Sequence, residues 1–249
     1  MFMKVIFLGT NGWYDNETGN TVCVLIDAPE GYILLDAGNG IHKLDRYMTE
    51  DKPAYLFLSH FHLDHIGGLH TIVRLNFPRG LQIFGQEGTR KILGDVLRQP
   101  YSVPIDGMPF KVDIRELPED LAAVPFLEDF RPLVHVSPCT GFRFRLGGKV
   151  ITYCTDTGLC DNLIELGRDA DILITECSAL SGQQRSSWPH LAPEDAVVVS
   201  KKSGAKRVVL VHFNASLYPT AESRRQVQAF VGREADNVTI SHDDMIIEL

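Results

Sequence analysis

The alternation of short apolar runs with turn residues predicts β-strands over the first third of the chain. Each run is bounded by residues such as glycine, proline, asparagine or aspartate, which favour turns. The predicted strands are residues 3–8, 22–26, 32–35, 54–58 and 81–85. Residues 27–31 indicate a hairpin-like connection between the second and the third of these strands. Helical spacing of apolar residues follows at 69–75 and 86–98.

The second half of the chain predicts further strands, a hairpin and several helices. Residues 141–146 and 149–154 flank a Gly147-Gly148 turn, which is typical of a hairpin. Other strands are expected at 171–175, 207–211, 238–240 and 245–247, and helices at 161–167, 193–203 and 221–232. The proline-rich segment 100–132 allows only two strand predictions, one at 110–116 and one leading into 133–134. Because strands followed by helices occur twice, we expect a mixed α/β fold with two sheets packed face to face and helices outside.

Composition and charge narrow the class of protein. With 249 residues, 44% of them hydrophobic, the chain fits one globular domain spanning residues 1–249. No apolar stretch approaches the roughly 18 residues that a membrane-spanning helix needs, so no membrane is expected as a partner. The net charge of −8 disfavours long nucleic acid, because such binding depends on Lys and Arg neutralising phosphates. Five scattered cysteines indicate reduced thiols in a cytoplasmic protein.

Three imidazoles and one carboxylate gather just after the strand predicted at 54–58. They are His60, His62, Asp64 and His65. Adjacent half-buried imidazoles need partners for both ring nitrogens, and a divalent metal supplies such a partner. If the chain is extended there, His60 and His62 point the same way. This run therefore predicts a metal site.

The H-x-H-x-D-H run, followed by glycines at 67 and 68, resembles the signature of the metallo-β-lactamase fold hydrolases. The resemblance covers nearly the whole chain. It implies an αββα four-layer sandwich of two mixed β-sheets with helices on the outer faces. It also implies three further ligands, each near the end of an apolar run, which are His135, Asp156 and His212.

The resemblance implies that these side chains hold two divalent metal ions. One ion would be held by three imidazoles, those of His60, His62 and His135. The other would be held by Asp64, His65 and His212. Asp156 and a water or hydroxide would lie between the two ions. Such nitrogen and oxygen donors suit Zn, with Mn or Fe as alternatives, and suit Cu(I) poorly.

A further pair of polar residues resembles the phosphodiesterase branch of this family, which includes tRNase Z. Glu176 ends an apolar run and His190 precedes a predicted helix, as a Glu and a His do in that branch. There the imidazolium is thought to stabilise the scissile phosphate or to protonate the leaving oxygen. The match is partial, because the branch has His, Ser-Thr and Gly where this chain has Thr175, Leu191-Ala192 and Thr155. Two interpretations therefore stay open, a catalytic pair or a loop cap beside an exposed histidine.

We expect a metal-dependent hydrolase with a dinuclear centre that cleaves phosphodiester bonds by attack of a metal-bridging hydroxide. Asp64, Glu176 and His190 are the candidate catalytic residues, Asp64 as the acceptor of the proton from water. The expected substrate is a small molecule or a short phosphodiester, and a homodimer stays open.

Two other functions are compatible with the same fold. One is a tRNA 3′-processing endonuclease of the tRNase Z type, which the negative charge and the lack of a basic Gly/Pro-rich insertion disfavour. The other is an iron-dependent oxidoreductase, which analysis of the bound metal would identify. A scaffold that has lost its metals is disfavoured, because all seven ligand positions are intact.

Overall fold

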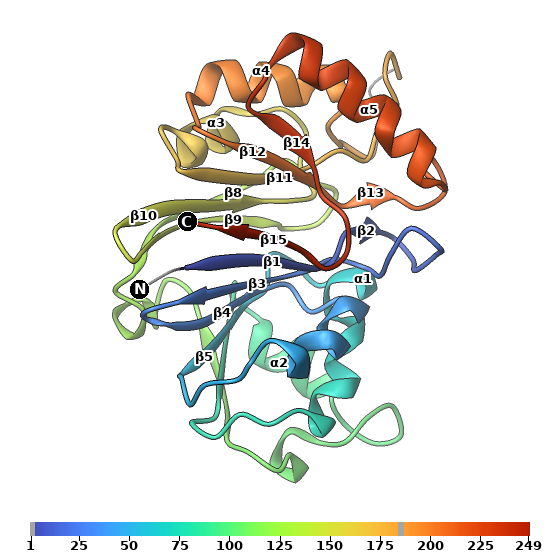
Figure 1. Cartoon of the computed structure of the whole chain (residues 1–249). Coiled ribbons are helices and arrows are strands. Elements are labelled where there is room, and N and C mark those ends of the chain that lie inside the picture. The colour runs from blue at the N-terminus through green and yellow to red at the C-terminus, as the bar shows by residue number, and fades with distance from the viewer. Residues whose placement is uncertain (1–2, 184–186) are drawn as a thin grey trace.

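The computed structural model describes residues 3–183 and 187–249; the predicted 1–249 domain therefore includes five residues outside this description, 1–2 and 184–186. Over the described part, two β-sheets form the centre of the fold (Figure 1). The strands of the first sheet follow the spatial order β15 (Met245–Glu248), β1 (Lys4–Gly9), β3 (Cys23–Ala28), β4 (Gly31–Leu35), β5 (Ala54–Phe57), β6 (Leu81–Gly85) and β7 (Val112–Glu116). Neighbours from β15 to β4 are antiparallel, and those from β4 to β7 are parallel.

The second sheet is also mixed. Its strands follow the order β14 (Val238–Ile240), β12 (Val208–Val211), β11 (Ile172–Glu176), β10 (Lys149–Cys154), β9 (Thr140–Leu146) and β8 (Leu127–Pro132). The pairs from β14 to β10 are parallel, and the other two are antiparallel. A short parallel pair of β2 (Asn11–Gly12) and β13 (Phe213–Asn214) joins the chain after β1 to the chain after β12.

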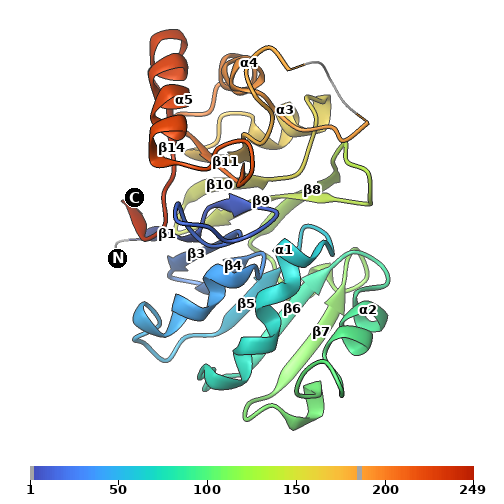
Figure 2. The same ribbon diagram turned by 90° about the vertical axis from the view of Figure 1, so that its right-hand side faces the viewer.

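Helices cover the outer face of each sheet, as Figure 2 shows. The helices over the second sheet are α3 (Asp161–Gly167), α4 (Pro193–Ser203) and α5 (Ala221–Glu234). Those on the side of the first sheet include α1 (Leu63–Ile66), α2 (Thr89–Val96) and the 3₁₀ helices η1 (Asn39–Arg46) and η2 (Gly67–Arg74). Two more 3₁₀ turns, η3 (Ile105–Gly107) and η4 (Leu121–Ala123), lie in the proline-rich segment. No helix of the described residues is long and apolar enough to cross a membrane.

The alternating direction of the side chains along each strand places apolar residues on both faces of a sheet, so the two sheets pack face to face. Successive side chains of a strand point to opposite faces. In β1, Val5 and Phe7 enter the core between the sheets, whereas Ile6 enters the core under the helices of the first sheet. Phe57 of β5 meets Phe144 of β9 with ring centroids 4.9 Å apart, so aromatic rings fill the space between the two sheets. The expected αββα sandwich is confirmed.

Several elements differ from the sequence-based expectation. The helix expected at 86–98 is the shorter α2, which begins after Gly88 in a left-handed conformation (φ 90°). The helical segment expected at 69–75 is the 3₁₀ helix η2. The sequence pattern predicted neither η1 nor the β2–β13 pair, because two-residue strands and 3₁₀ turns leave little periodicity in a sequence.

Candidate metal centre

Five of the seven predicted ligands lie in loops that follow strands of both sheets, and the other two, Asp64 and His65, lie in the short helix α1. His60 and His62 follow β5, and Asp156 follows β10. His212 lies between β12 and β13, and His135 lies in the loop after β8, three residues beyond the strand end. Asp156 (φ 55°) and His212 (φ 56°) adopt left-handed backbone conformations, which cost energy for residues other than glycine and are typical of functional sites.

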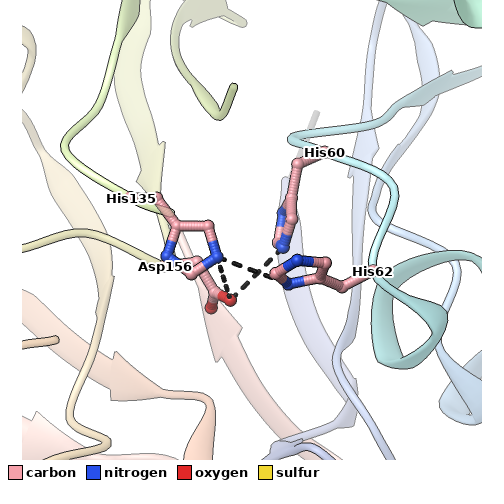
Figure 3. Close-up of side chains that lie close together, drawn as sticks. All are labelled: His60, His62, His135 and Asp156. Carbon is pink, nitrogen blue, oxygen red and sulfur yellow. Dashed lines mark hydrogen bonds and ion pairs between the residues drawn. The ribbon is translucent and has the colours of Figure 1, made fainter. Parts of the chain in front are cut away.

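Four of the predicted ligands form a first cluster, His60, His62, His135 and Asp156. One donor atom from each lies within 4.8 Å of the others, and Figure 3 shows the four side chains pointing toward one another. The Nε2 atom of His60 lies 3.4 Å from Oδ2 of Asp156, and the Nε2 atom of His135 lies 3.7 Å from the same oxygen. The Nε2 atom of His135 is also 3.3 Å from Nδ1 of His62.

The remaining three predicted ligands, Asp64, His65 and His212, form a second cluster. The Nε2 atom of His212 lies 3.2 Å from Oδ2 of Asp64 and 3.1 Å from Nε2 of His65. Asp156 contacts this cluster too, with Oδ1 3.0 Å from His212 and Oδ2 3.5 Å from His65. The carboxylate of Asp156 therefore lies between the two clusters.

Hydrogen bonds hold three of the imidazoles with Nε2 facing the clusters. Nδ1 of His65 is 2.8 Å from Oδ2 of Asp36. Ser178 donates its hydroxyl to the carbonyl of His212, so its oxygen accepts from Nδ1 of His212 at 2.9 Å. Ser59 likewise donates to Asp36, and its oxygen accepts from Nδ1 of His60 at 3.0 Å. When Nδ1 carries the proton, the lone pair of Nε2 is available to a metal.

Two observations test whether the clusters fit a metal ion. The buried Nε2 atom of His60 makes no hydrogen bond to any of the described residues, although it faces the first cluster. No lysine or arginine among the described residues forms an ion pair with Asp64 or Asp156, and the ion pairs that these carboxylates make within the same residues are all with imidazoles. Buried oxygen and nitrogen donors that converge in this way suit a divalent cation.

Electrostatics within the clusters also favour added positive charge. Burial opposes a proton on His65 and His212, but the neighbouring carboxylates, with Asp156 first among them, together outweigh the effect of burial on the pKa of both imidazoles. The pKa of His65 is raised well above its usual range, and that of His212 to about 10. Burial opposes the charge of Asp156, but these two imidazoles hold its pKa well below the usual range. Burial lowers the pKa of His135 to about 3, so this imidazole is neutral near pH 7.

Asp36 supports the site, and the sequence analysis did not single it out. It is fully buried after β4, with a left-handed backbone (φ 57°). Its carboxylate accepts hydrogen bonds from the backbone and hydroxyl of Ser59 and, at 2.7 Å, from the hydroxyl of Tyr153 in the other sheet. An apolar strand ending in a carboxylate is the pattern that led to Asp156, so the same criterion would have found Asp36.

The structure brings Glu176 and His190 together beside the first cluster. Nδ1 of His190 lies 2.8 Å and 3.0 Å from the two carboxylate oxygens of Glu176. Glu176 also accepts hydrogen bonds from the backbone N–H groups of Thr157 and Ser178, so it caps the neighbouring loops as well. Burial opposes a proton on His190, but the carboxylate of Glu176 raises the pKa of His190 above its ordinary value.

A pocket of about 550 Å³ opens over both clusters. Its lining includes predicted ligands from each cluster, together with His190 and two tryptophans, Trp13 and Trp188. None of the metal-type donor groups found among the described residues includes a cysteine. Cys139 is near the centre, with Sγ 3.9 Å from Nδ1 of His60, but burial raises the pKa of this thiol well above its usual range. It is therefore a protonated core residue.

Comparisons with known proteins agree with this geometry. Residues 32–213 match the family model described as a beta-lactamase superfamily domain. The chain is 27% identical over 219 residues to the probable metallo-hydrolase YhfI of Bacillus subtilis, covering 84% of this chain and 86% of YhfI. It is 24% identical over 304 residues to ribonuclease Z of Pyrococcus abyssi, covering 98% of each.

The crystal structure of the metallo-β-lactamase fold protein YhfI from Bacillus subtilis superposes over the whole of both chains, with a TM-score of 0.80 at 23% identity. This likeness shows the fold. The chain belongs to the beta-lactamase superfamily. Within that superfamily it is a metallo-hydrolase, with histidine and aspartate groups arranged as for a metal site.

Proposed function

We propose that this metallo-hydrolase cleaves phosphodiester bonds with two divalent metal ions, of which zinc suits the donors best. His60, His62 and His135 would hold one ion. Asp64, His65 and His212 would hold the other. Asp156 would contact both ions, since its two oxygens face the two clusters. Cations in these positions supply Lewis-acid activation of water and neutralise charge on the substrate.

The protein's own residues act on protons and on charge. The Oδ2 atom of Asp64 lies at the pocket and is held by the backbone N–H of Trp13 at 2.7 Å, so it is positioned to accept a proton from attacking water. The carboxylate has this capacity at neutral pH, because the nearby imidazoles of His65 and His212 hold its pKa below the usual range against the effect of burial. Its low basicity favours orientation of the water over strong base catalysis.

The observation that carries the proposal is the Glu176–His190 ion pair. Glu176 is fully buried and His190 lines the pocket, so the pair presents the Nε2 side of a protonated imidazole to a bound substrate. A phosphodiester needs this feature, because negative charge grows on its phosphoryl oxygens and on the leaving oxygen during cleavage. The hydrogen bonds of Glu176 to backbone amides make the pair rigid.

Processing of tRNA 3′ ends is a second candidate, supported by the similarity to a protein named ribonuclease Z. The net charge of −8 opposes it, because long RNA is bound mainly through phosphate neutralisation. A precursor tRNA and a short diester offered to the same preparation would distinguish the two functions. An iron-dependent oxidoreductase would be identified by bound iron and oxygen consumption.

The proposal is tested with bis-p-nitrophenyl phosphate, a p-nitrophenyl thioester and a chromogenic cephalosporin, each with Zn, Mn and Fe. We expect turnover of the phosphodiester alone. His190→Ala should reduce the rate by about 10²- to 10⁴-fold, the usual contribution of a general acid. His70→Ala is the matched control, because His70 is an exposed histidine outside the donor groups. Equal rates for these two variants would remove His190 from the mechanism.

A further inference from the structure

The two tryptophans of the chain both line the pocket over the donor clusters. Trp13 is 66% exposed and Trp188 is 55% exposed. Large apolar side chains are normally buried, and exposed ones that gather at a pocket mark a binding surface. Both tryptophans, whose side chains are the largest aromatic ones of the chain, therefore lie where a substrate would bind.

Trp13 is attached to the second cluster. Its backbone N–H donates to Oδ2 of Asp64, and its backbone adopts a left-handed conformation (φ 76°) that a bulky residue rarely takes. The preceding Gly12 packs against the ring of His212 so closely that a Cβ atom there would collide with the imidazole. Asn11 and Gly12 pair with β13, next to His212 in the chain. The position of Trp13 is therefore fixed relative to the centre.

Trp188 lies beside the first cluster. Its ring centroid is 6.0 Å from that of His62 and 6.3 Å from that of His135. Each of the two donor clusters therefore has one tryptophan beside it, and both tryptophans line the same pocket.

The charge of the pocket is the second observation. Among the described residues that line it, none is lysine or arginine, and three are aspartates, Asp64, Asp156 and Asp195. Two divalent cations and His190 would therefore supply the positive charge that a substrate meets. That charge lies at the centre, and the described lining residues include no lysine or arginine to meet a second phosphate.

We infer that the substrate is a small phosphodiester with a single negative charge and a planar aromatic ring, such as a nucleobase, which stacks on the indoles of Trp13 and Trp188. This inference rests on the proposed function and specifies its substrate class. An indole presents a flat π surface that favours a planar ring, and base stacking on such residues tolerates different bases. An alkyl chain gains no comparable stacking.

The test compares two substrates with the same leaving group and the same charge, thymidine 5′-(p-nitrophenyl phosphate) and ethyl p-nitrophenyl phosphate. With the metal-loaded enzyme, KM should be at least about fivefold lower for the thymidine ester, the low end of stacking on one aromatic residue. Trp188→Ala and Trp13→Ala should each reduce this preference, by raising the KM of the thymidine ester more than that of the ethyl ester. Trp188→Phe should retain it. Tyr101→Ala is the control, because Tyr101 is an exposed aromatic residue (72%) that does not line the pocket.

Intrinsic fluorescence supplies a readout that does not depend on turnover. Because the chain has only two tryptophans, thymidine 5′-methyl phosphate should quench the emission of the loaded enzyme, and ethyl methyl phosphate should not. Trp13→Phe and Trp188→Phe leave one indole each, so the two variants assign the quenching to each position. Urea unfolding of each alanine variant establishes that it is folded.

The outcomes separate this inference from the proposed function. Equal KM values for the two esters, or an equal loss for both in the tryptophan variants, would overturn the stacking site and leave the phosphodiesterase intact. Preference for hexadecyl p-nitrophenyl phosphate would also overturn it and make the apolar rim a lipid site. Tighter binding of the doubly charged p-nitrophenyl phosphate would contradict the charge argument. If no diester is turned over, the proposed function fails, and the fluorescence titration alone decides on stacking.

Discussion

The Asp36→Asn substitution tests the hydrogen bonds that support the metal centre without changing any predicted ligand. Oδ1 of Asp36 accepts from the backbone N–H of Ser59 at 2.8 Å. Oδ2 accepts from the hydroxyl of Ser59 at 2.8 Å, the hydroxyl of Tyr153 at 2.7 Å and Nδ1 of His65 at 2.8 Å. Asparagine keeps one oxygen for the backbone N–H. It places an amide nitrogen where Oδ2 was, so three of the four acceptor contacts are lost.

The size of the effect follows from burial. A hydrogen bond to a charged group contributes about 1.5–3 kcal/mol, but three that share one oxygen do not add. Removal of one partner from a buried charged group typically costs about 3–5 kcal/mol. We expect Asp36→Asn to lower the free energy of unfolding of the metal-free protein by about 3–5 kcal/mol. Because Asp36 orients His65, metal affinity should also fall, by about 10- to 100-fold.

Two measurements check this prediction. Urea denaturation in the presence of a chelator gives the free energy of unfolding, and competition with a chromophoric chelator gives the zinc affinity. Asp45→Asn is the matched control, because Asp45 forms an exposed ion pair with Arg74 at 2.8 Å and such pairs contribute less than about 1 kcal/mol. If Asp36→Asn matched Asp45→Asn in both assays, the argument that Asp36 positions His65 would be refuted.

The remaining predictions concern the ligands, the acid and a buried arginine. Elemental analysis after dialysis should find about one metal equivalent fewer in His62→Ala and neither ion retained in Asp156→Ala, since Asp156 faces both clusters. Phosphodiester turnover should fall to background in both variants. Full metal content in Asp156→Ala would contradict the role of Asp156 in holding both ions. The carboxylate of Glu176 raises the pKa of His190, so activity that needs its proton is present below the raised pKa and is lost as the pH rises through it. Glu176→Gln removes that charge and should move the alkaline limb of the kcat profile to lower pH, whereas an unmoved limb would show that another group sets it. Arg224 of α5 is buried against the Phe213 ring and donates to Thr10, Asn11 and Thr18. Arg224→Met should therefore lower the free energy of unfolding by about 3 kcal/mol in urea titration, and an unchanged midpoint would count against these bonds.

Local patterns were enough to predict most elements and the early part of the site. Continuous apolar runs bounded by turn residues identified β1, β3, β4 and β5, because each strand has one face in each core and is therefore apolar on both faces. His60, His62, Asp64 and His65 were recognisable because they lie within six positions of the chain. His135, Asp156 and His212 each lie near the end of an apolar run, which does not by itself indicate a metal ligand. Only the family resemblance proposed that these three residues share a site with the early cluster.

The surroundings of the centre could not be predicted in the same way. Asp36 binds Tyr153 across 117 positions of sequence, and Asp64 binds His212 across 148. Such contacts are made by loops whose paths depend on how the two sheets pack. No local periodicity records that packing.

The sequence by itself determined the strands, the helices and the chemical types of the donors, since these depend on neighbouring residues. Only the tertiary structure decided that Glu176 meets His190, that serines and Asp36 orient the imidazoles, and that both tryptophans line one pocket. The physical reason is that side-chain direction at a strand end is set by backbone conformations such as the left-handed Asp156 and His212. Packing over the whole molecule imposes those conformations, and local propensity disfavours them.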